Sequence, residues 1–181
     1  MFRRYSRFFL ATMMLTAMSG LAASEDPKTE KISLFEGVTL EVPVSFKSTK
    51  PKSRMLKYEF KVGEEDKSAR LTMMAAGGGI DANIKRWKGQ FAGGDPDEQK
   101  SEKISVSGWD VHVVDCSGTF AERMGGPFAG GKMVQREDYA MVGAIIVEPE
   151  GRLFFIKMTG PAAVVKPNRE AFVTMLKSME R

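Results

Sequence analysis

The stretch AMVGAIIV, residues 140–147, contains no polar side chain that could face water. An uninterrupted apolar run of this length, bounded by turn-forming residues, is typical of a strand covered on both faces. The turn follows at once, since EPEG at 148–151 has proline second and glycine fourth, as type I turns favour. The next run, LFFIKM at 153–158, is again apolar. We therefore expect an antiparallel hairpin at the centre of a sheet.

Earlier segments alternate apolar and polar residues with a period of two, which predicts strands with one buried face. In the first segment, Val38, Leu40 and Val42 share that face. A further hairpin is expected where a short strand is followed by Gly108 and a largely apolar arm. The predicted strands are residues 38–43, 56–62 and 69–73, and the two hairpin arms are 104–106 and 109–116.

Two helices are expected to pack on this sheet. Ile80, Ile84, Trp87 and Phe91 recur at intervals of four, three and four residues, which is one stripe of a helix that the glycines at 93–94 would end. A second helix is expected to begin near Pro167, because proline is favoured at the first helical position. Its inner stripe comprises Ala171, Phe172, Met175, Leu176 and Met179.

The N-terminal sequence predicts export. Arg3, Arg4 and Arg7 precede an apolar run at residues 8–21, which ends in small residues, as a signal peptide does. We interpret residues 1–24 as a signal peptide and expect a periplasmic or secreted protein that meets the membrane only through this segment. An uncleaved N-terminal anchor is the alternative.

Length and charge restrict the remaining chain. Residues 25–36 contain Pro27 and many charges, so we expect a flexible lead, followed by a single domain at 37–181. The chain has 27 Lys and Arg against 23 Asp and Glu. Losing the three arginines of the signal leaves a net charge near +1, which gives no support to nucleic-acid binding. Cys116 is the only cysteine, which excludes an intramolecular disulfide, and we expect it to be a small buried apolar residue.

Several sequence patterns suggest chemistry and fail on inspection. GPFAGGK at 126–132 has the spacing of a phosphate-binding loop, but Met133 replaces the hydroxyl residue and a strand follows instead of a helix. Asp110, His112, Asp115 and Cys116 share one predicted strand, but His112 and Cys116 would stand about 13 Å apart along it. The acidic residues at 95–98 lack the spacing of a calcium loop. We expect no catalytic residue, metal or cofactor.

The segment from Ser117 to Met133 is the candidate recognition site. We interpret it as a connection of about seventeen residues without a regular element, and long loops in compact domains often bind ligands. Its apolar and cationic side chains could contact a protein or a small molecule. The candidate ligand or partner residues are Phe120, Arg123, Met124, Phe128 and Lys132.

Four stretches carry a resemblance to a known fold. They are residues 37–43 (GVTLEVP), 83–91 (NIKRWKGQF), 154–161 (FFIKMTGP) and 171–178 (AFVTMLKS). They resemble exported bacterial proteins that are similar to the PsbP-like fold. That fold is shared by the extrinsic subunit P of photosystem II and a Ran-binding nuclear import factor. The resemblance implies an α+β domain in which a central antiparallel sheet lies between helices, and the chain matches no functional residue set of either relative.

The sequence therefore favours an exported, non-enzymatic binding or accessory module with an unidentified protein or small-molecule partner. Two alternatives stay open. One is a hydrolase or metal-dependent enzyme whose residues converge from distant strands, and the other is an envelope protein tethered by its N-terminus.

Overall fold

The computed structural model describes residues 28–123, 131–148 and 150–181. The predicted signal peptide and the candidate residues Met124 and Phe128 lie outside these ranges. In the part that is described, no helix is long and apolar enough to cross a membrane.

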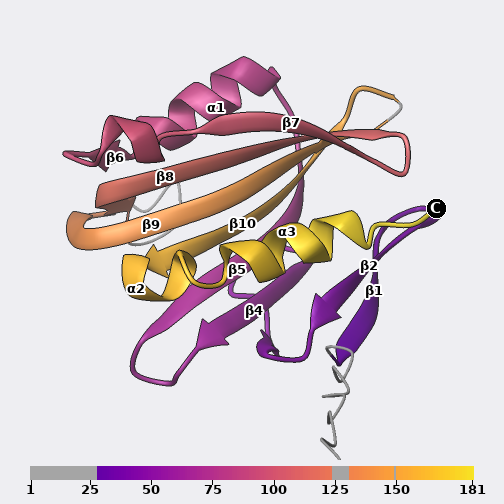
Figure 1. Ribbon diagram of the computed structural model, residues 1–181, viewed down its shortest axis with the longest axis horizontal. Coiled ribbons are helices and arrows are strands. Elements are labelled where there is room, and N and C mark those ends of the chain that lie inside the picture. Colours follow the sequence, from indigo (N-terminus) through magenta and orange to yellow (C-terminus); the bar gives the residue numbers. More distant parts are fainter. Residues whose placement is uncertain (1–27, 124–130, 149) are drawn as a thin grey trace, which may run out of the picture.

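The domain is built around an antiparallel sheet of eight strands (Figure 1). Its strand order is β3-β4-β5-β10-β9-β8-β6, and β7 also pairs with β8. The bounds are β3 (Phe46–Thr49), β4 (Tyr58–Gly63), β5 (Ser68–Ala76), β6 (Phe91–Ala92), β7 (Ser101–Val106), β8 (Trp109–Arg123), β9 (Met133–Val147) and β10 (Leu153–Pro161). The predicted central hairpin is confirmed, because β9 and β10 pair along their length and are themselves flanked by β8 and β5.

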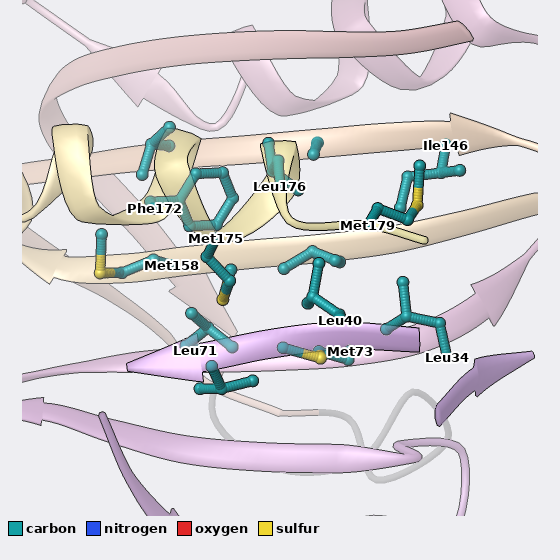
Figure 2. Packing of buried hydrophobic residues seen from close by; sticks show 14 of the residues in the cluster. Leu34, Leu40, Leu71, Met73, Ile146, Met158, Phe172, Met175, Leu176 and Met179 are labelled. Atoms are coloured by element: carbon teal, nitrogen blue, oxygen red, sulfur yellow. The ribbon is translucent and has the colours of Figure 1, made fainter. Parts of the chain in front are cut away.

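One face of the sheet is covered by the last two helices and the first hairpin. These elements are α2 (Ala162–Val165), α3 (Arg169–Lys177), β1 (Thr29–Phe35) and β2 (Val38–Pro43). Figure 2 shows Phe172 and Met175 of α3 and Leu40 of β2 gathered with Leu71 and Met158 of the sheet in one apolar cluster. Every labelled side chain in that view is apolar and at most 1% exposed. We call this side the sealed face.

The opposite face carries α1 (Ile80–Lys88), and Figure 1 shows α1 across the sheet from α3. Trp87 of α1 packs its ring against the backbone of Gly143, where an added Cβ would lie 2.6 Å from the ring. The small residue therefore lets the helix approach β9 closely. Phe155 meets the same indole edge-on, with ring centroids 5.0 Å apart. We call this side the α1 face.

The segment expected to be a flexible lead is a strand over most of its length. Residues 29–35 form β1, which pairs with β2 from Thr29 to Phe35. Ile32 and Leu34 are buried in the sealed-face core. The charged residues before Ile32 obscured the alternation in the sequence, so residues 29–35 belong to the domain.

Both predicted helices exist with different bounds. The first ends at Gly89, before the glycines at 93–94, and Phe91 lies in β6 opposite Phe120. The helical spacing of Phe91 was therefore coincidental, although its burial was predicted. The last helix starts at Arg169, two residues after Pro167 as predicted, and a separate short helix, which was not predicted, precedes it.

The expected long loop begins as a strand. Residues 117–123 continue β8 and pair with the start of β9, with a β-bulge between Gly118 and Phe120. Residues 117–123 are therefore part of the sheet and not of a loop. The fold class is confirmed as a single antiparallel α+β domain, but the sheet dominates it, since the helices have nine, four and nine residues and cover each face only in part.

Candidate functional site

Four polar side chains project side by side from the two strands at the centre of the sheet. Arg70 of β5 lies opposite Thr159 of β10, and Thr72 lies opposite Lys157 in the same antiparallel register. Alternation along both strands directs these four to the α1 face, while Leu71 and Met158 between them point into the sealed core. Central strands that are covered on both faces are usually apolar, so this polar block needs a reason beyond packing.

The polar block lines a hollow of about 350 Å³ that α1 leaves open. We call this hollow the sheet-face pocket. One wall comes from β5 and β10, and the other from the lower part of the β8–β9 hairpin and the residue that precedes β6. Its lining consists of Ser68, Arg70, Thr72, Gln90, Phe120, Ala121, Glu122, Arg123, Tyr139, Lys157, Thr159 and Gly160.

An aromatic stack forms the hairpin wall of the pocket. The rings of Phe120 and Tyr139 are nearly parallel, with centroids 6.1 Å apart and an interplanar angle of 4°. Phe91 supports Phe120 from behind at 5.0 Å. The pocket therefore combines an apolar ring surface on one side with charged and hydroxyl groups on the other, a composition common in small-ligand sites.

Arg70 is held by a buried carboxylate. Its Nε and one terminal nitrogen donate to the two oxygens of Glu59 at 2.7 and 3.1 Å, and Glu59 is only 3% exposed. The backbone N–H of Lys52 also donates to Glu59, at 2.8 Å. The hydrogen bond from Arg70 is the largest influence that holds the pKa of Glu59 below its ordinary value. The pair is therefore ionised at neutral pH and fixes Arg70 at the pocket wall.

Lys157 is the unusual cation of the site. Burial lowers its pKa to about 8, and the positive charges of Arg86 and Arg70 add to that effect. Its ammonium lies 5.8 Å from the centre of the Trp87 ring, a cation–π distance. No carboxylate lies within 4.0 Å of it among the described residues. Burial of a lysine without a partner is costly, which is typical of functional sites.

Two further polar atoms of the pocket lack hydrogen-bond partners. In the described part of the chain, only three buried side-chain oxygens or nitrogens have none, and two of them, Thr159 Oγ1 and Gln90 Oε1, belong to residues that line the sheet-face pocket. Buried polar groups are nearly always satisfied, so such a concentration needs an explanation. A bound molecule would supply the missing partners.

A second hollow, of about 380 Å³, lies on the sealed face between α2, α3 and the short 3₁₀ helix η1 (Pro96–Glu98). Four of its six charged groups are already joined in two pairs, and the other two, Asp97 and Lys100, carry opposite charges. Arg169 binds Asp115 at 2.8 Å, Lys166 binds Glu98 at 2.6 Å, and Ser117 donates to Glu98. The paired residues offer a ligand no free charge. We therefore regard this hollow as a weaker candidate binding site than the sheet-face pocket.

The predicted recognition residues divide between the pocket and its surroundings. Phe120 and Arg123 line the sheet-face pocket, but they do so from a strand and not from a loop. Lys132 is exposed just before β9 and is not part of the lining. Lys157 and Thr159 were not predicted as site residues, although a lysine that interrupts an apolar central strand was an available signal.

His112 and Cys116 occupy packing positions. Both lie on the α1 face of β8, where Cys116 is 2% exposed within the apolar cluster around Trp87. Burial raises the pKa of the Cys116 thiol to about 11, so the thiol is protonated and unreactive at neutral pH. Across residues 28–123, 131–148 and 150–181, no three His, Cys, Asp or Glu side chains gather as metal ligands do.

The architecture is similar to two solved structures. The first is cyanobacterial PsbP (CyanoP) from Synechocystis sp. PCC 6803, at 10% identity over 90% of this chain and 98% of that chain, with a TM-score of 0.51. The second is LpqN, involved in cell envelope biogenesis of Mycobacterium tuberculosis, at 12% identity over 84% and 89%, with a TM-score of 0.50. No protein-family model and no curated protein matches the sequence. The chain thus has the PsbP-like fold that its sequence resembles.

Proposed function

We propose that this protein is an exported, non-enzymatic binding or accessory module and that the sheet-face pocket is its recognition site. One observation carries the proposal: two central strands turn four polar side chains into a hollow on a sheet that is otherwise packed with apolar residues. The volume of about 350 Å³ suits a small ligand or a side chain of a partner protein.

Two further points support a binding role. The lone thiol is buried and protonated, and the carboxylates at the pocket, Glu59 and Glu122, are engaged by Arg70 and Arg136. These groups are therefore committed to structure rather than poised as nucleophile and base. The signal-like N-terminus favours export, and the similar structure LpqN is a protein of cell envelope biogenesis.

The experiment compares a filled pocket with an open one. Ser68→Trp places an indole at the pocket wall, and Ser48→Trp places the same side chain at an exposed position on the edge strand β3. The protein would be purified natively, and mass spectrometry after denaturation would identify co-purified small molecules. We expect the wild type and Ser48→Trp to retain a ligand that Ser68→Trp loses. Equal retention by all three proteins would overturn the proposal.

Deletion of residues 125–131 tests the part of the hairpin that lies beyond the pocket. If recognition uses the pocket wall alone, the deletion leaves ligand retention intact, and if it also uses the hairpin tip, retention falls. The same native preparation tests export, because a signal peptidase product begins near Ser24. An intact Met1 in membrane-extracted protein would favour tethering instead.

A further inference from the structure

We infer that the sheet-face pocket binds a small organic anion, a carboxylate or a phosphate monoester, whose charged group meets Lys157 and Thr159 and whose apolar part lies against Phe120 and Tyr139. This inference rests on the proposed function, since it assigns the ligand class of the same site. It is argued from the charge balance of the pocket, from the unpartnered hydroxyl and from the position of the ring surface.

The pocket carries positive charge without compensation. Among its lining residues, Arg70 is neutralised by Glu59 and Glu122 is neutralised by Arg136 at 2.9 Å. Lys157 is paired with no carboxylate of the described residues. A lysine that lies near other cations and has no carboxylate partner lowers the stability of the fold. The same lysine attracts an anion.

The surroundings of Lys157 strengthen this preference. Arg86 approaches from α1 and Arg70 from β5, and both disfavour its ammonium form, while the Cys116 thiol from β8 has a small opposite effect. Gly143, its neighbour on β9, contributes no side chain. An anion beside Lys157 would be attracted by its ammonium and by Arg86, which no carboxylate of the described residues pairs, and would offset the cost of burying the ammonium.

Thr159 supplies a directional contact. Its Oγ1 is buried without a partner in the described residues, whereas the Thr72 hydroxyl is placed to donate to the backbone carbonyl of Lys157 at 3.4 Å. The Thr159 hydroxyl therefore gives up no contact inside the protein if its side chain turns to donate to an anionic oxygen in the hollow. A charge-assisted hydrogen bond of this kind is stronger than one between neutral groups.

The ring surface accounts for the apolar part of the ligand. On β9, Met141 faces Thr159 and Tyr139 faces Pro161, the second residue after Thr159. The Phe120–Tyr139 stack therefore begins where the polar block ends. A benzoate-like molecule that places its carboxylate on Lys157 would lay its ring toward this stack.

Calorimetric titration of the mature protein tests the charge requirement. The probes are benzoate and phenyl phosphate, with benzamide as the neutral counterpart and inorganic phosphate as the ringless one. We expect the two organic anions to bind at least tenfold more tightly than benzamide and inorganic phosphate. Equal affinity for benzoate and benzamide would overturn the anion assignment, and equal affinity for the two phosphates would overturn the ring contact.

Three variants locate the binding. Lys157→Met should weaken benzoate at least tenfold, while Lys85→Met, at an exposed position of α1, should leave it unchanged. Thr159→Val should weaken benzoate about threefold to tenfold without lowering the melting temperature, because the lost hydroxyl makes no internal hydrogen bond. A lower melting temperature with unchanged affinity would assign Thr159 a structural role and contradict the inference.

The pH dependence provides an independent signature. Benzoate is ionised throughout the range above pH 6, so any change must come from the protein. We expect its affinity to be constant up to about pH 7 and to fall as Lys157 loses its proton near pH 8. Lys157→Met should abolish this dependence. If Ser68→Trp removes a co-purified neutral ligand while Lys157→Met has no effect, the anion inference fails and the proposed function stands.

Discussion

The two faces of the central sheet use the same strands differently. On the sealed face, every strand except β6 contributes apolar side chains to one continuous cluster that includes Phe172, Leu71 and Met158. On the α1 face, a smaller apolar cluster around Trp87 and Phe120 leaves a hollow in which Arg70, Lys157 and their polar neighbours stand. Alternate residues of β5 and β10 thus serve packing on one side and polar display on the other.

This difference separates stability from recognition. Burial of apolar area stabilises the fold, and the sealed face supplies most of it. The polar half of the α1 face lowers stability through a half-buried unpaired lysine and an unsatisfied hydroxyl. Proteins are expected to retain such destabilising groups where the groups bind a ligand. Substitutions in the sealed core should therefore lower the free energy of unfolding, whereas substitution of the unpaired polar groups in the pocket should weaken ligand binding.

The largest effect is expected on the sealed face. Phe172 is completely buried in α3, and truncation to alanine leaves a cavity between the helix and the sheet. We expect Phe172→Ala to lower the free energy of unfolding by about 3 to 5 kcal/mol, as measured by urea denaturation. A loss below about 1 kcal/mol would mean that this face does not carry the fold.

The next largest effect concerns the contact between α1 and the sheet. A Cβ at Gly143 would lie 2.6 Å from the Trp87 ring, so Gly143→Ala must displace the indole. We expect a loss of about 1 to 3 kcal/mol in the same assay. Trp87→Leu should remove most of that additional cost in a double-mutant cycle, whereas purely additive losses would show that the two residues do not touch.

Glu59→Gln weakens the support of Arg70. The substitution removes the charge from a carboxylate that is 3% exposed and accepts two hydrogen bonds from Arg70. We expect the free energy of unfolding to fall by about 1 to 2 kcal/mol at pH 7. Since the folded-state pKa is lowered, this contribution is present above the ordinary pKa and is lost as pH falls through the folded value. The wild type and variant should converge in acid, and a constant difference would contradict the ionised pair.

Lys157→Met should stabilise the protein while it removes anion binding. The folded-state pKa of about 8 lies below the ordinary 10.5, so the cost of the charged lysine is fully present below pH 8 and is relieved as pH rises toward 10.5. We expect a gain of about 1 kcal/mol at pH 7, less than the full shift implies because the side chain is partly exposed. Destabilisation at pH 7 would show that Lys157 belongs to the packing.

The sequence predicted the fold well where each pattern had one interpretation. The run at 140–147 and the turn at 148–151 were enough to place the central hairpin. The prediction was wrong where charged residues interrupt the apolar alternation. This is the case at β1, where only Ile32 and Leu34 face the core. The same happened beyond Cys116, where glycine and small residues concealed the continuation of β8, because pairing partners rather than local composition keep that segment extended.

The candidate site was predictable only in part. Phe120 and Arg123 were found because residues 117–133 were expected to form a binding loop, although both line the pocket from strand β8. Lys157 and Arg70 come from strands that are 87 residues apart in sequence, and only the β5–β10 register brings them together. The pairing register between β5 and β10 cannot be read from any local sequence pattern. The isolated polar residues inside otherwise apolar strands were the available signal, and their meaning depended on knowing which face was already covered.

The most direct test of the contrast between the faces is an NMR titration of the Lys157 ε-methylene and ammonium in the mature protein, with and without benzoate. The free protein should show a pKa near 8, and saturating benzoate should raise it. A Lys157 that titrates near 10.5 in the unliganded protein, with no change on adding benzoate, would contradict the proposal that this lysine is an unpaired cation that binds an anion.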